Sequence, residues 1–345
     1  MSRGRQRVAG FVALVLVCVA IGGLYISHAV NRDKEKAAKS PPTTVASGAA
    51  LEQLLEQRHV IFRSTAYGDS YGRLGVLPAD DVGGPRVITE LSCDRVAASV
   101  DRGICLHADR GVFTSYKALL FDKSFRPLAT LPLEGVPSRA RVSADSRWAA
   151  TTTFVSGDSY AAASFSTRTV IYDLKSNKAA ANLEEFAVTK DGNRIQSIDF
   201  NFWGVTFAAD GDTFYATLGT GGKNYLVKGS VGERSVVVLR DGVECPALSP
   251  DGTRIAFKSR QSGIPVKWQL SVLDLATLVD HPIADTRSVD DQVEWLDDQT
   301  LIYGLPEAGG GTAASNTWVI PADGSGRAKL FTKETWSTVV VPAAA

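Results

Sequence analysis

The chain has 345 residues, of which 44% are hydrophobic and 21% are charged. This apolar share is typical of a folded globular protein and excludes a chain that is disordered throughout. The 37 basic and 37 acidic residues give a formal net charge of zero, which argues against a general nucleic-acid-binding protein with a basic face. The length does not require two domains, because single propellers and barrels routinely exceed about 200 residues.

The N-terminal segment predicts a membrane-spanning helix. Residues 1–7 contain three arginines and no acidic residue, and residues 8–26 then run for 19 residues without a charge. A helix of that length covers about 28 Å, close to the thickness of the apolar core of a bilayer. Because positive flanks stay in the cytoplasm, we expect residues 1–7 to be cytoplasmic and the remainder of the chain to lie outside the membrane.

Two other interpretations of this segment stay open. A secretory signal peptide would be cut near the small residues Ser27 and Ala29, although the apolar run is longer than usual and Tyr25 and Ile26 are bulky. The rest of the chain would then be secreted. A lipoprotein signal would need small residues before Cys18, where the sequence has leucine and valine.

Residues 27–57 are expected to form a flexible tether. Residues 31–50 are first charged and then rich in Pro, Thr, Ser and Ala, without an apolar period. Residues 51–57 have the spacing of a short helical turn ahead of the first strand. We therefore place one folded domain at residues 58–345.

A hairpin recurs along this domain, where short apolar runs alternate with Asp, Gly, Asn and Pro as in consecutive β-strands. The clearest copy is residues 247–258 (ALSPDGTRIAFK), in which Pro250 fixes φ and Gly252 tolerates positive φ. Weaker copies lie at residues 96–106, 142–150, 205–216 and 293–303. The turn aspartates of the five copies are Asp101, Asp145, Asp210, Asp251 and Asp298.

The spacing of these copies predicts an all-β, six-bladed β-propeller. The turn aspartates are separated by 44, 65, 41 and 47 residues, and three of these spacings match one blade of four strands. Before the first copy the chain supplies three strands, at residues 60–63, 73–77 and 86–89, and after the last it ends in one strand at residues 338–342. Together these four would complete a sixth blade and close the ring. A β-sandwich or an incomplete solenoid would not explain ends that complement each other.

The hairpin ALSPDGTRIAF resembles the WD40-like repeat of TolB-like six-bladed propellers, and the resemblance extends over residues 59–342. It implies a propeller fold and a translocation-type protein of the cell envelope. Its motif residues build turns and strand cores, so they imply no chemistry. TolB itself carries an α/β domain ahead of its propeller, whereas this chain resembles a membrane-anchored variant without that domain.

No motif in the sequence predicts catalysis or a cofactor. Residues 68–72 (GDSYG) match a nucleophile elbow, but that elbow needs a strand-to-helix turn and here two strands flank the motif. Residues 157–160 repeat GDSY in the equivalent loop of another blade. This recurrence favours a structural role, in which Gly allows the turn and Asp and Ser cap backbone amides, over a nucleophile. The four histidines lack the spacing of a zinc site. The glycines at residues 309–311 lack the following Lys-Ser/Thr of a phosphate-binding loop.

Three acidic pairs flank predicted turns and are expected to be solvated. A calcium site at the rim or axis of the propeller is the alternative, although the sequence has no D-x-D-x-D-G loop. We therefore expect no metal and no cofactor. The pairs are Asp80 and Asp81, Asp290 and Asp291, and Asp297 and Asp298.

Cys93 and Cys105 are predicted to form a disulfide. They flank a hairpin centred near Ser99 with six residues on each side, so they would face each other on paired strands. Directly opposed residues have Cβ atoms about 4.5–5.5 Å apart, close to what a disulfide needs. A register slip of one residue would place them on opposite faces. Cys245 is expected to be free and buried.

Irregular loops predict where this protein binds its partners. In a propeller the connections from second to third strands and from blade to blade emerge on one face, and here the former are irregular. Loops longer than a hairpin requires are disproportionately functional, and aromatic and arginine side chains are enriched at binding hot spots. The alternative is that these loops, which are rich in Ser, Gly and Ala, are merely solvated. The candidate binding residues on them are Tyr67, Tyr71, Tyr160, Phe165, Arg168 and Arg260.

Three functions fit these features. The first, which we expect, is a membrane-tethered, non-catalytic propeller outside the cytoplasm that binds a protein or another component of the cell envelope. The second is an enzyme of the lactonase or hydrolase type with an axial pocket, for which the expected ring of His, Asp and Glu at strand starts is missing. The third is a sensor of small ligands such as sugars.

Overall fold

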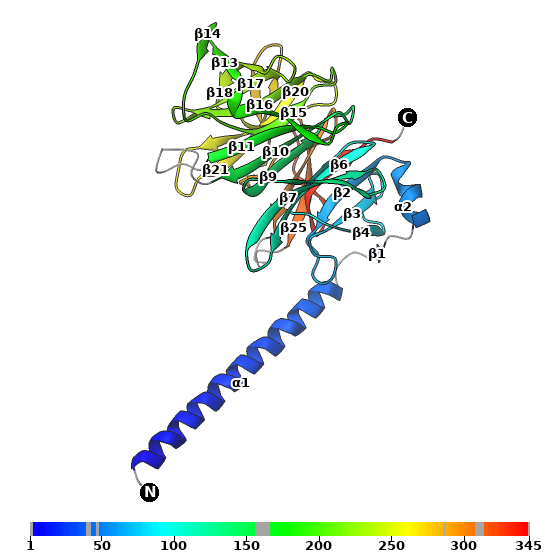
Figure 1. The fold of residues 1–345 in the computed structure, drawn as a ribbon. Coiled ribbons are helices and arrows are strands. Elements are labelled where there is room, and N and C mark those ends of the chain that lie inside the picture. Colours follow the sequence, from blue (N-terminus) through cyan, green and yellow to red (C-terminus); the bar gives the residue numbers. More distant parts are fainter. Residues whose placement is uncertain are drawn as a thin grey trace.

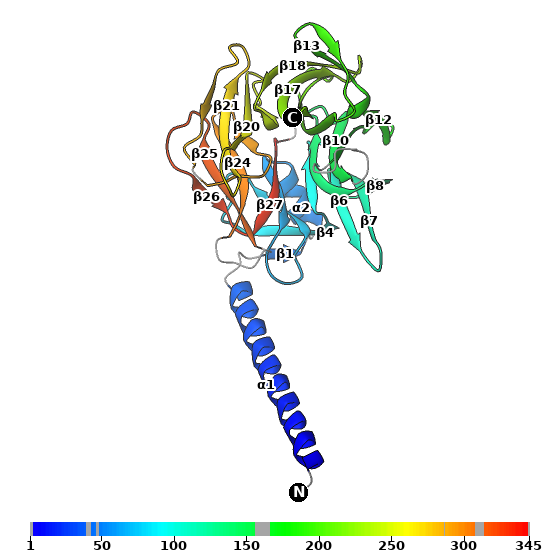
Figure 2. The same ribbon diagram turned by 90° about the vertical axis from the view of Figure 1, so that its left-hand side faces the viewer.

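A long N-terminal helix leads into a ring of β-sheets in the computed structural model, which describes residues 3–38, 43–45, 48–155, 166–285, 287–307 and 314–343 (Figures 1 and 2). Helix α1 (Arg3–Ala38) is longer at both ends than the predicted span of residues 8–26. Its part Gly10–Arg32 is long and apolar enough to cross a membrane and is not packed into the fold. This helix fits a membrane anchor or a signal sequence.

The segment expected to be a flexible tether is partly ordered. Helix α1 continues to Ala38, and strand β1 (Thr43–Val45) pairs in parallel with β4 (Arg86–Ser92). Helix α2 (Gly48–Leu55) buries Leu51 and Leu54 against the first blade. The short helical turn expected at residues 51–57 is thus present as α2, which docks through two leucines three residues apart.

Six sheets form the ring, which confirms the predicted all-β, six-bladed propeller. Each complete blade contains four consecutive antiparallel strands, and we number these blades 2–6 in chain order. Blade 2 is β5 (Arg95–Ala98), β6 (Arg102–Arg110), β7 (Thr114–Asp122) and β8 (Pro127–Pro132), and blade 3 is β9 (Val136–Val142), β10 (Trp148–Val155), β11 (Ser166–Asp173) and β12 (Lys178–Asn182). Blade 4 is β15 (Asn201–Phe207), β16 (Thr213–Thr220), β17 (Lys223–Ser230) and β18 (Ser235–Asp241). Blade 5 is β19 (Glu244–Leu248), β20 (Arg254–Gln261), β21 (Lys267–Asp274) and β22 (Asp280–Pro282), and blade 6 is β23 (Glu294–Asp297), β24 (Thr300–Pro306), β25 (Ser315–Pro321) and β26 (Lys329–Thr332).

Blade 1 joins the two ends of the propeller, as the sequence predicts. Its strands are β2 (His59–Ser64), β3 (Arg73–Pro78), β4 and the C-terminal strand β27 (Thr335–Val341), which pairs antiparallel with β2. The register places Val339 opposite Ile61 and Val341 opposite His59. Val339 and Val341 are buried in the same cluster as Leu51, so the last strand is part of the core.

The recurrent hairpins close through side-chain hydrogen bonds in their turns. In the clearest copy, Asp251 accepts hydrogen bonds from the Ser249 hydroxyl at 2.5 Å and the Thr253 amide at 3.0 Å, while Gly252 has a φ of 71°. Partial burial would raise the pKa of Asp251, but these hydrogen bonds outweigh it and hold the pKa well below its usual value. Asp145 accepts from Ser143 in the same way in blade 3. The repeated aspartates therefore serve to close the turns of the hairpins.

The one long repeat spacing comes from an addition to the outer edge of blade 4. After β12 the chain forms the 3-10 helix η1 (Leu183–Glu185) and then the hairpin of β13 (Ala187–Lys190) and β14 (Asn193–Ile195). Strand β13 pairs in parallel with β18, so blade 4 becomes a six-stranded sheet. Figure 1 shows this hairpin projecting at the end of the propeller away from α1.

Cys93 and Cys105 form a disulfide with a Cα–Cα distance of 5.4 Å. The pair is the predicted one, but the predicted register is wrong. Cys105 lies opposite Val96, and the hairpin is centred between Val100 and Asp101 because Ser99 to Arg102 form its turn. Cys93 therefore reaches its partner from the connection ahead of β5. Cys245 is free and buried.

Candidate functional site

Two faces of the propeller differ in their connections. We call the face that carries the second-to-third and blade-to-blade connections the irregular-loop face. Its described second-to-third connections are residues 65–72, 111–113, 221–222 and 262–266 in blades 1, 2, 4 and 5. The opposite face carries the aspartate turns, for example residues 143–147 and 249–253. Since consecutive strands are antiparallel, this assignment follows from the topology.

The predicted binding residues of blade 1 lie on the irregular-loop face. Tyr71 is 44% exposed, and its ring lies 4.8 Å from the guanidinium carbon of Arg63. Tyr67 is half-buried in the same connection. Positive φ values at Gly68 (103°) and Gly72 (81°) let the loop turn back into β3. Tyr71 is therefore accessible to a partner, while Arg63 limits its freedom.

The other predicted binding residues are spread around the ring. Arg168 at the start of β11 forms an ion pair with Glu134, and Arg260 near the end of β20 is exposed. These arginines lie in blades 3 and 5, whereas Tyr67 and Tyr71 lie in blade 1. Blades without a predicted residue therefore stand between them. Tyr160 and Phe165 lie outside the described residues. Of the predicted binding residues that the structure describes, those of blades 1, 3 and 5 do not form one cluster, and their role in binding stays a prediction.

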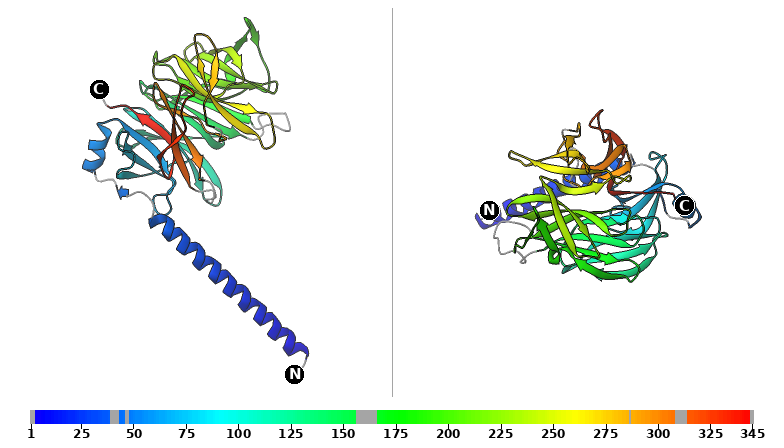
Figure 3. Two further views of the ribbon diagram at one scale, coloured as in Figure 1. Left: turned by 180° about the vertical axis from the view of Figure 1, so that it is seen from behind. Right: turned by 90° about the horizontal axis from the view of Figure 1, so that it is seen from above.

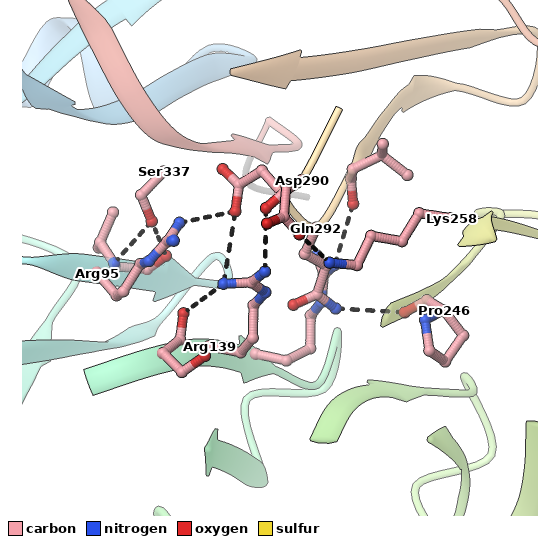
Figure 4. A network of polar contacts seen from close by, with 12 residues as sticks. Arg95, Arg139, Pro246, Lys258, Asp290, Gln292 and Ser337 are labelled. Atoms are coloured by element: carbon pink, nitrogen blue, oxygen red, sulfur yellow. Dashed lines mark hydrogen bonds and ion pairs between the residues drawn. The ribbon is translucent and has the colours of Figure 1, made fainter. Parts of the chain in front are cut away.

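The axis of the propeller is occupied by a charged network that sequence reasoning missed. The connection between β22 and β23 covers residues 283–293, whereas the connection between β18 and β19 has only residues 242–243. Its last part, Asp290–Gln292, enters the centre of the ring, as Figure 4 shows. We call these three residues the axial segment.

Hydrogen bonds and ion pairs join the axial segment to several blades (Figure 4). Asp291 accepts a hydrogen bond from Arg95 of β5 at 2.8 Å and lies 3.8 Å from the guanidinium of Arg139 of β9. Asp290 forms an ion pair with Lys258 of β20. The side-chain amide of Gln292 donates to the carbonyl of Pro246 in β19 at 3.2 Å. One short segment therefore links blades 2, 3 and 5.

The charges around the axis balance, and little space is left between them. Four cationic side chains face four carboxylates, and the cavity that remains has a volume of about 40 Å³. This volume holds a few water molecules and is far smaller than a pocket for an organic substrate. The cations are Arg95, Arg139, Arg141 and Lys258, and the carboxylates are Glu244, Asp290, Asp291 and Glu294.

Burial makes these charges depend on one another. It lowers the pKa of Arg95, and the neighbouring Asp291 opposes that effect. It likewise raises the pKa of Glu244, against the attraction of Lys258. The Nε atoms of Arg139 and Arg141 have no protein partner among the described residues, and water in the cavity would satisfy them.

The expectation that Asp290 and Asp291 are solvated is wrong for Asp291, which is 4% exposed. The carboxylate is drawn inward because two arginines occupy the axis opposite it. A signal for this existed in the sequence. Arg139 and Arg141 are two residues apart on β9, so both point to the same face of that strand, which is the axial one. Buried cations require buried anions.

A further, half-buried carboxylate lies between blades 3 and 4. Glu184 in η1 accepts hydrogen bonds from the amides of Thr169 at 3.1 Å and Phe202 at 3.3 Å. Burial raises the pKa of Glu184 to about 7 in spite of these hydrogen bonds, which favour the charged form. Glu184 thus titrates near neutrality at a blade interface.

Comparison with known proteins decides the fold. No protein-family model and no curated relative matches the sequence. Among solved structures, TolB from Acinetobacter baumannii has a TM-score of 0.58 at 18% identity, covering 84% of this chain and 67% of that one. The fold is that of a TolB-like propeller.

Further matches to this TolB-like propeller are more distant. An oligogalacturonate lyase in complex with manganese has a TM-score of 0.49 at 9% identity, covering 74% of this chain and 73% of that one. A putative 6-phosphogluconolactonase from Bacteroides uniformis has a TM-score of 0.46 at 13% identity, covering 81% and 83%. These two matches assign no chemistry to this chain.

The TolB-like propeller shows no metal cluster in the parts that the structure describes, where no three His, Cys, Asp or Glu side chains are placed to share an ion. At the GDSYG motif, Ser70 lies between β2 and β3, and its hydroxyl is 3.4 Å from that of Ser64. No helix follows it, so the geometry of a nucleophile elbow is not met at this position. The related residues 157–160 lie outside the described residues.

Proposed function

We propose that this protein is a membrane-tethered, non-catalytic binding module outside the cytoplasm that uses its irregular-loop face. The observation that carries the proposal is the filled axis. In a propeller enzyme the axial pocket would hold the substrate, whereas here Asp291 and its arginine partners leave a cavity of about 40 Å³. Recognition is then left to the faces, and the irregular-loop face offers the larger and more varied connections.

The tether in this proposal is α1. Its apolar part Gly10–Arg32 has the length of a bilayer-spanning helix, and three arginines precede it. The positive flank supports an orientation with the N-terminus in the cytoplasm and the propeller on the other side. The likeness to TolB supports a location in the cell envelope. A cleaved signal sequence would give the same propeller without its tether.

A crosslinking experiment tests this function. The full chain with an affinity tag is crosslinked in membranes, and its partners are compared with those of a Tyr67→Ala and Tyr71→Ala double variant. Val279→Ala is the matched control, because Val279 is 66% exposed on the opposite face. We expect partner capture to fall at least about tenfold in the double variant and to persist in the control, with equal melting temperatures. Equal capture by both variants would contradict the assigned face.

A further inference from the structure

Two strand ribbons carry bare apolar tips on the irregular-loop face. In blade 2, Val112 and Phe113 are 96% and 89% exposed at the turn between β6 and β7. These two strands have 9 residues each, whereas their neighbours β5 and β8 have 4 and 6. The ribbon therefore extends past the blade, and Val112 and Phe113 contribute nothing to its core.

The second tip lies across the ring, in blade 5. Ile264 is fully exposed between β20 and β21, and Pro265 beside it is exposed as well. Arg260 and Lys267 flank this turn and are exposed, and residues 259–268 contain no acidic side chain. In a six-bladed ring, blades 2 and 5 are diametrically opposed. The two apolar tips are thus the widest-spaced pair of contacts that one face can provide.

Both tips lie on the side of the propeller from which α1 extends. Figures 1 and 3 show the β6–β7 ribbon and the loop next to β21 on this side, with α1 running away from it. The span ends at Arg32, and the first strand that pairs with the propeller begins at Thr43. The intervening ten residues cover at most about 36 Å even when fully extended. Thr43, where the chain joins the propeller, is therefore held within about 36 Å of the surface that α1 enters.

We propose that the irregular-loop face docks on the lipid surface of the membrane that anchors α1, with Phe113 and Ile264 inserted at the interface. This inference rests on the proposed membrane tether and concerns the apolar tips of blades 2 and 5, not the blade 1 loop that carries Tyr67 and Tyr71. Exposed apolar side chains of this size cost free energy in water and gain it at the headgroup boundary, where aromatic rings are favoured. Arg260 and Lys267 would contact lipid phosphates beside Ile264.

A fluorescence experiment on the full chain tests the docking. In a Cys18→Ser background, Phe113→Cys, Ile264→Cys and the opposite-face control Val279→Cys are each labelled with an environment-sensitive nitrobenzoxadiazole dye. The other cysteines do not react, because Cys245 is buried and Cys93 is bonded to Cys105. Each labelled protein is reconstituted in vesicles of phosphatidylcholine and phosphatidylglycerol that contain a lipid with a nitroxide in its headgroup region.

We expect the dyes at positions 113 and 264 to shift to shorter wavelength and to be quenched at least about twofold more than the dye at position 279. Equal emission at all three positions, or stronger quenching at position 279, would overturn the docking. Flotation of the same samples separates the two hypotheses. If the chain floats with the vesicles while the dyes at positions 113 and 264 stay in water, the tether is supported and the docking is contradicted. If the chain does not float, both are contradicted.

Discussion

Removal of the last strand tests the closure of the ring most directly. A chain ending at Ser337 lacks the residues that pair with His59, Val60 and Ile61 of β2. It also loses Val339 and Val341, which are 7% and 1% exposed. Burial of each of these side chains stabilises the fold by about 1.5 kcal/mol or more. The sum of at least about 3 kcal/mol is a large fraction of the 5–15 kcal/mol that is typical of a whole domain.

This truncation should lower the melting temperature by about 6–12 °C or more, since 1 kcal/mol corresponds to about 2–4 °C in a domain of this size. The measurement is thermal unfolding of the full and truncated chains in the same detergent, followed by tryptophan fluorescence. Deletion of residues 342–345 is the control, because Pro342 and Ala343 are exposed and lie beyond β27. If both truncations melt at the temperature of the full chain, β27 does not close the ring.

Further predictions concern the buried charges, the disulfide and the anchor. Asp291→Ala leaves Arg95 without its carboxylate partner and should cost about 3–5 kcal/mol in urea unfolding; a loss below about 1 kcal/mol would contradict a structural role for the axial network. The pKa of Glu184 rises from 4.5 to about 7 on folding, so the folded state binds this proton more tightly and stability should fall as pH rises from 4.5 to 7. Glu184→Gln should flatten that slope in melting curves, and an unchanged slope would assign it to other groups. Replacing Cys93 and Cys105 by serine should cost about 2–3 kcal/mol in the same urea assay. Carbonate washing should leave the chain in membranes; release of a chain that begins near Val30 would identify a cleaved signal instead.

The ring was predictable because its turns are encoded locally. Each of blades 2–6 repeats an aspartate turn, and Asp251 and Gly252 act on backbone atoms a few residues away, so their spacing is visible in the sequence. The axial network is different. Asp291 meets Arg95 across 196 positions of the chain, and no local pattern records that distance. The disulfide was partly predictable. The pairing of Cys93 with Cys105 follows from their closeness in the sequence, whereas the register of the β5–β6 hairpin depends on which residues form its turn.

One added element also escaped prediction, for another reason. The hairpin of β13 and β14 attaches to an edge of blade 4 that the six-bladed pattern already satisfies, so nothing in the repeat demands it, whereas a short helical turn at residues 51–57 was expected where α2 forms. Their apolar content is small, and Leu51 and Leu54 are the main buried contribution of α2. The candidate binding face followed from topology alone. The exposure of Phe113 did not, because an apolar residue in a strand-like run predicts burial.

The pairing of β2 with β27 sets a timing problem for biosynthesis. Strand β2 is made before any other strand of the ring, and the 270 residues 65–334 must follow before its partner exists. At synthesis rates of about 5–20 residues per second, β2 waits for about 15–50 s with one edge unpaired. Such edges template wrong pairing with other chains. Copies of the chain are therefore most exposed to mispairing through β2 in the interval before β27 is made.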